Sequence, residues 1–215
     1  MIRRLITIAA ALLVLAPTLA LAQPDKGSDW TGYIAGGWGI AQGDSADAID
    51  DGWTLSGGAV FRPDPWPIGI SFGLEYSEYD LDREIVEFFE GSGGDVEIWA
   101  LTAGGMWSTR TDGAVDFYVN AGAGMYRVKA RIYDTALVNY PPYCPPWSWW
   151  CYPGGIGPGT VVKDSDSTTK AGVYAAVGVT FETASLNQFY IEARWQQIQN
   201  KQETEMVPIV IGFRW

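Results

Sequence analysis

The most informative segment for the fold is Met206-Val-Pro-Ile-Val-Ile-Gly-Phe-Arg-Trp215. The large apolar residues of this stretch alternate along it: Val207, Ile209, Ile211, Phe213 and Trp215. The intervening positions are mixed, and the last of them is the charged Arg214. Alternation with a period of two predicts a β-strand whose two faces meet different surroundings. About ten residues with one apolar face suit a strand that crosses a bilayer in a closed barrel, with that face toward lipid.

Seven further segments alternate in the same way and predict seven further strands. They are residues 30–41, 53–62, 68–79, 96–108, 114–132, 171–181 and 189–197. The parity of 96–108 is ambiguous; we place Trp99 and Trp107 outward, because this sets two tryptophans near opposite membrane interfaces. In a small barrel the other parity faces inward, and its glycines, alanines, serines and tyrosines suit a lumen that side chains fill.

The connections between these segments alternate in length. Three are short (63–67, 109–113 and 183–188), and four are longer or more polar (42–52, 80–95, 133–170 and 198–205). An even strand number with short turns at one end and longer loops at the other is typical of outer-membrane barrels. The sequence therefore predicts an all-β fold over 30–215, an eight-stranded antiparallel up-and-down transmembrane β-barrel with both termini in the periplasm. A soluble ligand-binding barrel, with its apolar face inward, is the alternative.

The start of the chain predicts export. Residues 1–22 have the charged start, apolar core and small-residue cleavage site of a signal peptide, and 23–29 follow as a short periplasmic tail. The alternative, a retained anchor, is opposed by the shortness of the apolar core. Cys144 and Cys151 are an even count in a secreted chain and predict a disulfide. The net charge of −11 argues against nucleic-acid binding.

Residues 30–215 as a whole resemble the small outer-membrane barrels of the OmpA/OmpX-like superfamily. The resemblance rests on the opening strand, Trp30-Thr-Gly-Tyr-Ile-Ala-Gly-Gly-Trp-Gly39, and on the terminal strand that ends in an aromatic residue. It implies a monomer in the cell outer membrane of a Gram-negative bacterium, in contact with outer-membrane lipids and lipopolysaccharide. It also implies that Phe213 and Trp215 form a signal read by the outer-membrane assembly machinery.

The composition restricts the chemistry. The chain has no histidine, whereas the enzymes known among outer-membrane barrels use a histidine for proton transfer. Histidine is also the commonest zinc ligand. Asp44, Asp47, Asp50 and Asp51 in the loop 42–52 lack the spacing of a calcium-binding EF-hand. We therefore predict no catalytic site, no cofactor and no metal site.

Charged residues on the inward parity predict a network in the lumen. They are Arg62, Glu75, Asp116, Glu182, Glu192, Arg194 and Arg214. An unpaired charge in a narrow barrel is costly, so these side chains are expected to pair. Two interpretations stay open: a salt-bridged plug, or a gate whose ion pairs switch to open a narrow pore for small solutes.

A basic run follows the outward apolar positions of 114–132. After Met125 the outward residues are Arg127, Lys129 and Arg131. From Val115 to Met125 a tilted strand crosses about one membrane thickness. The three cations should then emerge where the outer leaflet carries phosphates, which Arg binds through bidentate donors. They predict a lipopolysaccharide site, with a solvated basic rim as the alternative.

The connection 133–170 is the longest and holds an aromatic cluster, which predicts a partner-binding loop. The cluster comprises Tyr143, Trp147, Trp149, Trp150 and Tyr152, and the ring predicted between Cys144 and Cys151 surrounds its tryptophans. These aromatics either bind an external protein or glycan, pack on one another, plug the barrel mouth, or lie in the headgroup layer. The functional hypothesis is a non-catalytic barrel with a structural role in the envelope and partner-binding surface loops. The alternatives are the narrow pore and an adhesin or receptor acting through 133–170.

Overall fold

The computed structural model describes residues 29–63, 66–109, 115–140, 154–182, 188–199 and 204–215. Three predicted features lie outside these residues: the signal peptide, all of the tail except Asp29, and the aromatic cluster with Cys144 and Cys151. No helix in the described part of the chain has the length and apolar character needed to cross a membrane.

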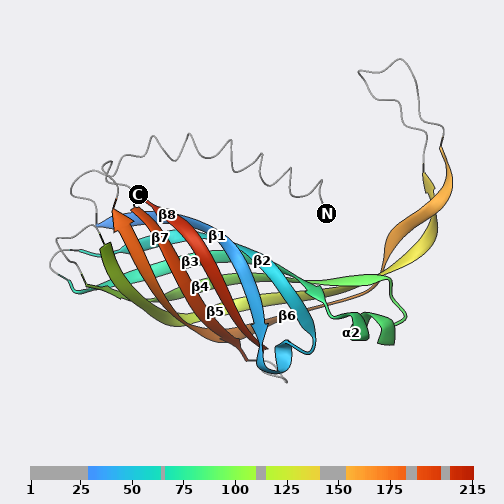
Figure 1. Cartoon of the computed structure of the whole chain (residues 1–215), viewed down its shortest axis with the longest axis horizontal. Helices are drawn as coiled ribbons and strands as arrows, with labels where there is room; N and C mark the ends of the chain where they lie inside the picture. Colours follow the sequence, from blue (N-terminus) through green and yellow to red (C-terminus); the bar gives the residue numbers. More distant parts are fainter. Residues whose placement is uncertain (1–28, 64–65, 110–114, 141–153, 183–187, 200–203) are drawn as a thin grey trace, which may run out of the picture.

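Eight antiparallel strands form a closed barrel, and neighbours in sequence are neighbours in space (Figure 1). They are β1 (Trp30–Gln42), β2 (Ile49–Phe61), β3 (Ile68–Leu81), β4 (Gly93–Ser108), β5 (Val115–Tyr140), β6 (Gly155–Glu182), β7 (Gln188–Ile198) and β8 (Thr204–Arg214). The last strand pairs with the first, with Trp38 opposite Ile209, so the sheet has no free edge along its closed part. The predicted eight-stranded antiparallel barrel is confirmed.

Side chains alternate between the outer face and the lumen as predicted. On β4, whose parity was ambiguous, Trp99 and Leu101 are exposed, whereas Ile98 and Ala100 are buried. The exposed large side chains on the barrel wall are mainly apolar, as a lipid-facing surface requires. From Trp99 to Trp107 the strand rises roughly 20 Å along the barrel axis, at about 3.3 Å per residue and about 40° of tilt.

Aromatic rings mark both edges of this apolar band. At one edge the ring centroids of Trp53 and Tyr76 lie 5.2 Å apart, and those of Tyr76 and Trp99 lie 4.8 Å apart. At the other edge Trp30 packs on Phe61 at 4.9 Å. We call the end that carries Trp30 and the chain's last residue the turn end, and the opposite end the loop end.

Side chains fill the lumen, and tyrosine rings pack on glycines of neighbouring strands. A Cβ atom on Gly178 would lie 2.3 Å from the Tyr118 ring, and one on Gly212 would lie 2.4 Å from the Tyr190 ring. Two buried apolar clusters result. The loop-end cluster includes Ile49, Tyr79, Val96, Ile98, Tyr126, Ile198 and Met206. The turn-end cluster comprises Tyr33, Ala35, Val60, Met106, Tyr118, Tyr190 and Val210.

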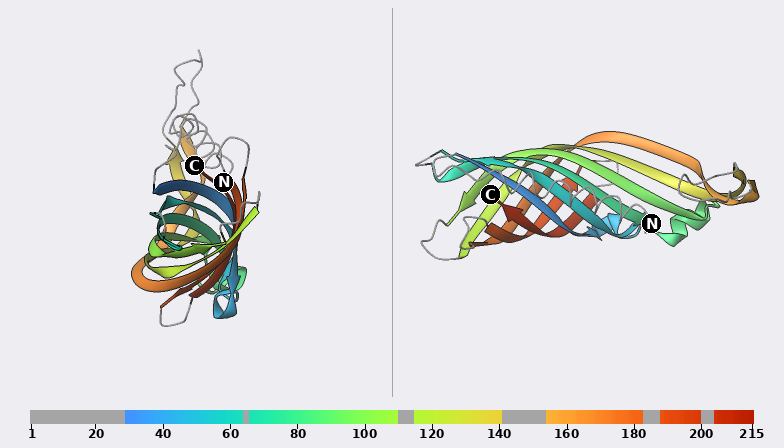
Figure 2. Two further views of the ribbon diagram at one scale, coloured as in Figure 1. Left: turned by 90° about the vertical axis from the view of Figure 1, so that its left-hand side faces the viewer. Right: turned by 90° about the horizontal axis from the view of Figure 1, so that it is seen from above.

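Two strands continue beyond the barrel. The pairing of β4 with β5 ends at Gly93 and Tyr133, and that of β6 with β7 ends at Gly172 and Ile198. The β5–β6 ladder goes on past a bulge to Tyr140 and Gly155. Figures 1 and 2 show this two-stranded ribbon projecting at the end opposite the C-terminus. We call residues 133–140 and 155–162 the arm.

The prediction that 133–170 is a loop is therefore wrong for 133–140 and 155–170, which are strand. The sequence of 155–170 contains Gly, Pro, Asp, Ser and Thr without apolar alternation, so a periodicity argument does not detect it. Backbone pairing with β5 holds these residues extended.

The predicted connection 80–95 is also partly ordered. It contains the short helix α2 (Arg83–Phe88), and Asp82 caps the helix by accepting a hydrogen bond from the Glu84 N–H at 2.7 Å. The loop also holds the base of the arm. Ser92 N–H donates to the Tyr133 carbonyl at 2.7 Å, and Lys163 Nζ donates to the Phe89 carbonyl at 2.9 Å. Lys163 is the extra residue of the bulge.

Candidate functional site

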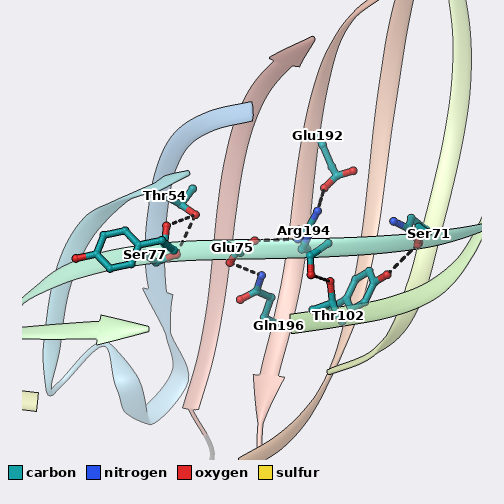
Figure 3. A network of polar contacts seen from close by, with 12 residues as sticks. Thr54, Ser71, Glu75, Ser77, Thr102, Glu192, Arg194 and Gln196 are labelled. Atoms are coloured by element: carbon teal, nitrogen blue, oxygen red, sulfur yellow. Dashed lines mark hydrogen bonds and ion pairs between the residues drawn. The ribbon is translucent and has the colours of Figure 1, made fainter. Parts of the chain in front are cut away.

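The middle of the lumen holds a buried ion-pair layer (Figure 3). Arg194 lies between two carboxylates, with Nη1 2.8 Å from Glu75 Oε2 and Nη2 2.7 Å from Glu192 Oε1. Gln196 Nε2 donates to Glu75 Oε1 at 2.8 Å, and the Tyr118 hydroxyl donates to Glu192 Oε2 at 2.8 Å. Each carboxylate thus receives hydrogen bonds on both oxygens, which compensates the cost of burying the charges.

The layer separates the two apolar clusters along β7. The inward residues of this strand run Tyr190, Glu192, Arg194, Gln196 and Ile198. Tyr190 belongs to the turn-end cluster and Ile198 to the loop-end cluster. A charge that crossed the lumen would therefore meet apolar side chains on both sides of the ion pairs.

Arg214 occupies a different environment. Its guanidinium carbon lies 4.2 Å from the centroid of the Tyr118 ring and 4.4 Å from that of Tyr190. Its Nη1 donates to Thr180 Oγ1 at 3.3 Å. The cation is thus stabilised mainly by ring faces within the turn-end cluster.

The other three residues of the predicted luminal network lie near the turn end and outside the ion-pair layer. Arg62 Nη1 donates to Ser108 Oγ at 2.6 Å. Asp116 Oδ1 accepts from Thr109 Oγ1 at 3.4 Å, and Glu182 Oε1 accepts from Gln188 Nε2 at 3.1 Å. Their positions in the sequence, near the turn ends of their strands, predict this separation from the deeper Glu75, Glu192 and Arg194.

Sequence reasoning missed a neutral polar network in the lumen. Ser71 Oγ donates to Asn120 Oδ1 at 3.0 Å, and the Tyr174 hydroxyl donates to the same oxygen at 3.2 Å. The polar character of Ser71 and Asn120 on the inward parity was the available indication. Among the described residues, no group of three or more His, Cys, Asp and Glu side chains could hold a metal ion.

The basic run of β5 lies on the outer face at the loop end, between strands β4 and β6. Each cation has one neighbour on β4 and one on β6. Arg127 lies opposite Trp99 and Thr169, Lys129 opposite Glu97 and Ser167, and Arg131 opposite Asp95 and Ser165. The row is therefore part of a three-strand surface.

Arg131 is engaged within this surface. It forms an ion pair with Glu97, lies 3.7 Å from Asp95 Oδ2, and donates to the Tyr133 hydroxyl at 3.4 Å. The hydrogen bond to Tyr133 and the pair with Glu97 hold the pKa of Arg131 above its usual value. Burial, together with a hydrogen bond from its hydroxyl to Asp95, raises the pKa of Tyr133. Arg127, by contrast, is exposed beside Trp99.

The terminal aromatics lie at the seam between the first and last strands. Trp215 and Gly32 exchange two backbone hydrogen bonds, of 3.1 and 3.0 Å. The Phe213 ring centroid lies 5.2 Å from that of Phe189 and 6.3 Å from that of Trp215. The predicted assembly signal is therefore part of the aromatic edge at the turn end.

The arm carries exposed aliphatic side chains. Leu137 is 77% exposed, Ile156 75% and Val162 54%. They share one face, because Leu137 lies opposite Pro158, Ile156 opposite Asn139 and Val162 opposite Tyr133, on alternate rungs of the ladder. The predicted partner-binding aromatics, Tyr143, Trp147, Trp149, Trp150 and Tyr152, fall in the sequence between the two arm strands and outside the described residues.

A closed antiparallel barrel with an apolar outer band and a filled lumen defines the class of outer-membrane β-barrel proteins. A family model for the outer membrane protein beta-barrel domain matches residues 7–208, and the chain belongs to this family. The chain is therefore a protein of the Gram-negative outer membrane. No curated protein matches the sequence.

The chain is similar to three solved structures. Neisserial surface protein A is similar with a TM-score of 0.55 and 14% identity, over 87% of this chain and 96% of that one. Ail of Yersinia pestis has a TM-score of 0.43 and 15% identity, over 87% and 99%. OprG of Pseudomonas aeruginosa has a TM-score of 0.47 and 10% identity, over 87% and 97%. At 14% identity the likeness to Neisserial surface protein A concerns the fold alone.

Proposed function

We propose that this barrel is a non-catalytic anchor in the outer membrane that presents its β5–β6 arm to a partner outside the cell. The observation that carries the proposal is the arm itself. It extends beyond the other strands, and one face exposes Leu137, Ile156 and Val162. Neighbouring apolar side chains that are exposed on a polar surface commonly mark an interaction site.

The orientation follows from the connections. Outer-membrane barrels keep short turns on the periplasmic side and longer loops outside. The connection from Phe61 to Ile68 is short and lies at the turn end, whereas α2 and the arm lie at the loop end. We therefore assign the turn end and both termini to the periplasm. There the assembly machinery can read Phe213 and Trp215 as the chain arrives. A single chain closes the barrel, which supports a monomer.

The sequence between the arm strands adds a second element to the proposal. A disulfide between Cys144 and Cys151 would close a small ring around Trp147, Trp149 and Trp150. Restricting these side chains before binding lowers the entropy lost on association. The chemistry suits an adhesin or receptor for an external protein or glycan, because Trp and Tyr often dominate binding interfaces.

The rival functions have less support. A narrow pore is opposed by the two apolar clusters and by the Arg194 ion pairs that lie between them. An enzyme is opposed by the absence of histidine from the whole sequence.

The test replaces 135–160 by an Asn-Gly turn that joins Asp134 to Val161, which face each other in the ladder. We expect heat-modifiable gel mobility and thermal unfolding close to those of the wild type. Binding of the purified protein to arrays of glycans and extracellular matrix proteins should be lost. A matched variant, Leu137→Ser with Ile156→Ser, keeps the arm and should weaken binding if the apolar face contributes. Unchanged binding without the arm would contradict the proposal, and steady channel currents in planar bilayers would favour the pore.

A further inference from the structure

The outer face of β5 has two cations that differ from Arg131. Arg131 forms ion pairs with Glu97 and Asp95, the acidic side chains on the neighbouring strand β4. Arg127 lies next to Trp99, which has no charge, and it is exposed. Lys129 follows it on the same face, opposite Glu97, whose carboxylate is paired with Arg131. Arg127 and Lys129 thus form a local positive pair on an otherwise acidic chain, whose net charge is −11.

This pair lies at the level of lipid headgroups. Trp99 belongs to the aromatic edge of the apolar band, in ring contact with Tyr76 at 4.8 Å. Aromatic girdles of membrane barrels lie at the interface between hydrocarbon and headgroups. Arg127, paired with Trp99 across the strands, is therefore within reach of the phosphates that begin there.

Hydroxyl groups complete the surface on the β6 side. Thr169 lies opposite Arg127, and Ser167 lies opposite Lys129. Directly opposite side chains in an antiparallel pair have Cβ atoms about 5 Å apart. Both hydroxyl residues are exposed. In the described part of the chain β7 stops pairing at Gly172, so no strand covers β6 beside Ser167 and Thr169.

We propose that Arg127, Lys129, Ser167 and Thr169 form a binding site for a phosphate group of lipid A. The Arg127 guanidinium donates two parallel hydrogen bonds to the phosphate, and Lys129 supplies a second positive charge. Ser167 and Thr169 donate from the neighbouring strand. Arg131 is excluded from the site, because the carboxylates of β4 already engage it. This revises the lipopolysaccharide site expected from the sequence.

The inference uses the proposed orientation, because lipid A occupies the outer leaflet, but it does not depend on the arm binding a partner. The test is therefore made on the full-length protein in detergent micelles, where both ends are accessible. Lipid A with both phosphates is titrated in, and the bound lipid is counted by native mass spectrometry. Dephosphorylated lipid A and phosphatidylglycerol are titrated separately. Variants Arg127→Gln with Lys129→Gln, and Arg131→Gln as the matched control, are compared with the wild type.

The wild type should bind lipid A, and the double variant should lose affinity on the order of tenfold or more, since two charge-assisted contacts are removed. Arg131→Gln should stay within about threefold, because its charge is already neutralised locally. Dephosphorylated lipid A should bind as weakly as lipid A binds to the double variant. Heat-modifiable mobility checks that each variant is folded. An equal loss in Arg131→Gln, equal binding of phosphatidylglycerol, or unchanged binding by the folded double variant would each overturn the assignment.

Discussion

The barrel wall and the arm are built from the same two strands, yet they are held by different interactions. In the wall, β5 pairs with β4 and with β6, and its side chains contact lipid on one face and a filled lumen on the other. In the arm, each strand has a single partner in the described chain. A two-stranded ribbon is marginally stable in water. Strand structure here therefore depends on neighbouring strands, and the arm depends on contacts at its base.

The largest difference in stability between wall and arm is expected when a positively charged side chain is removed from each. Arg194→Met should destabilise the barrel by about 3–5 kcal/mol, because Glu75 and Glu192 would be left buried without their cation. The free energy of unfolding is measured by urea titration in lipid vesicles. The triple variant Glu75→Gln, Glu192→Gln and Arg194→Met should recover much of the loss. Lys163→Met at the arm base should cost less than about 1 kcal/mol. Equal losses in the two single variants would contradict the distinction between wall and arm.

Arginine on the outer face should distinguish lipid from water. Leu74→Arg should cost roughly 2–4 kcal/mol, since a midplane arginine faces hydrocarbon. Leu137→Arg on the arm should change the free energy of unfolding by no more than about 0.5 kcal/mol, because its side chain is already in water. Both leucines are exposed in the isolated protein, at 52% and 77%. The pair therefore tests the position of the membrane, using the same urea titration. Similar losses at both sites would place the arm in lipid.

Added methyl groups should distinguish the close packing of the wall from the open surface of the arm. Gly178→Ala should cost about 1–3 kcal/mol, because its Cβ would overlap the Tyr118 ring. Gly155→Ala should have little effect, since nothing lies within 4 Å of the corresponding position. Thermal unfolding followed by gel mobility measures both. A tolerated Gly178→Ala would mean that the lumen is less filled than the contacts indicate.

The smallest effect concerns the base of the arm. Lys163→Ala removes the hydrogen bonds to the Phe89 and Glu90 carbonyls, of 2.9 and 3.1 Å. Barrel stability should change by less than about 1 kcal/mol. Amide hydrogen exchange in residues 155–162 should become faster while exchange in β7 stays constant. Lys170→Ala serves as the control for removal of a positive charge from the same strand. Unchanged exchange in 155–162 would show that the ladder alone keeps the arm ordered.

The sequence was sufficient to predict the strands of the wall, because the two faces of the wall have different surroundings. Lipid on one side and a narrow lumen on the other impose alternation, and the parity of β4 followed from Trp99 and Trp107. The arm lies beyond the closed part of the barrel, where no lumen faces one side of the strands, so this alternation is not imposed on it. The six residues of α2 are too few to show a helical period, so periodicity does not predict this helix.

The charged residues show a second limit. Parity assigned Glu75, Glu192 and Arg194 to the lumen, but which charges meet depends on the relative shift of neighbouring strands. The alternation of residues within one strand gives no information about that shift. The same limit applies to the outer face, where the pair between Arg131 and Glu97 follows from the register of β4 with β5.

The continuity of β5 and β6 from arm to wall has a mechanical consequence. A partner that pulls on the arm along its axis loads both strands together, and the force passes through their backbones into the barrel. There the hydrogen bonds to β4 and β7 lie across the direction of pull, so many of them share the load at once. Lys163 and Ser92 transfer part of it to the α2 loop. The geometry suits a tether under sustained tension, because rupture would require the wall itself to shear.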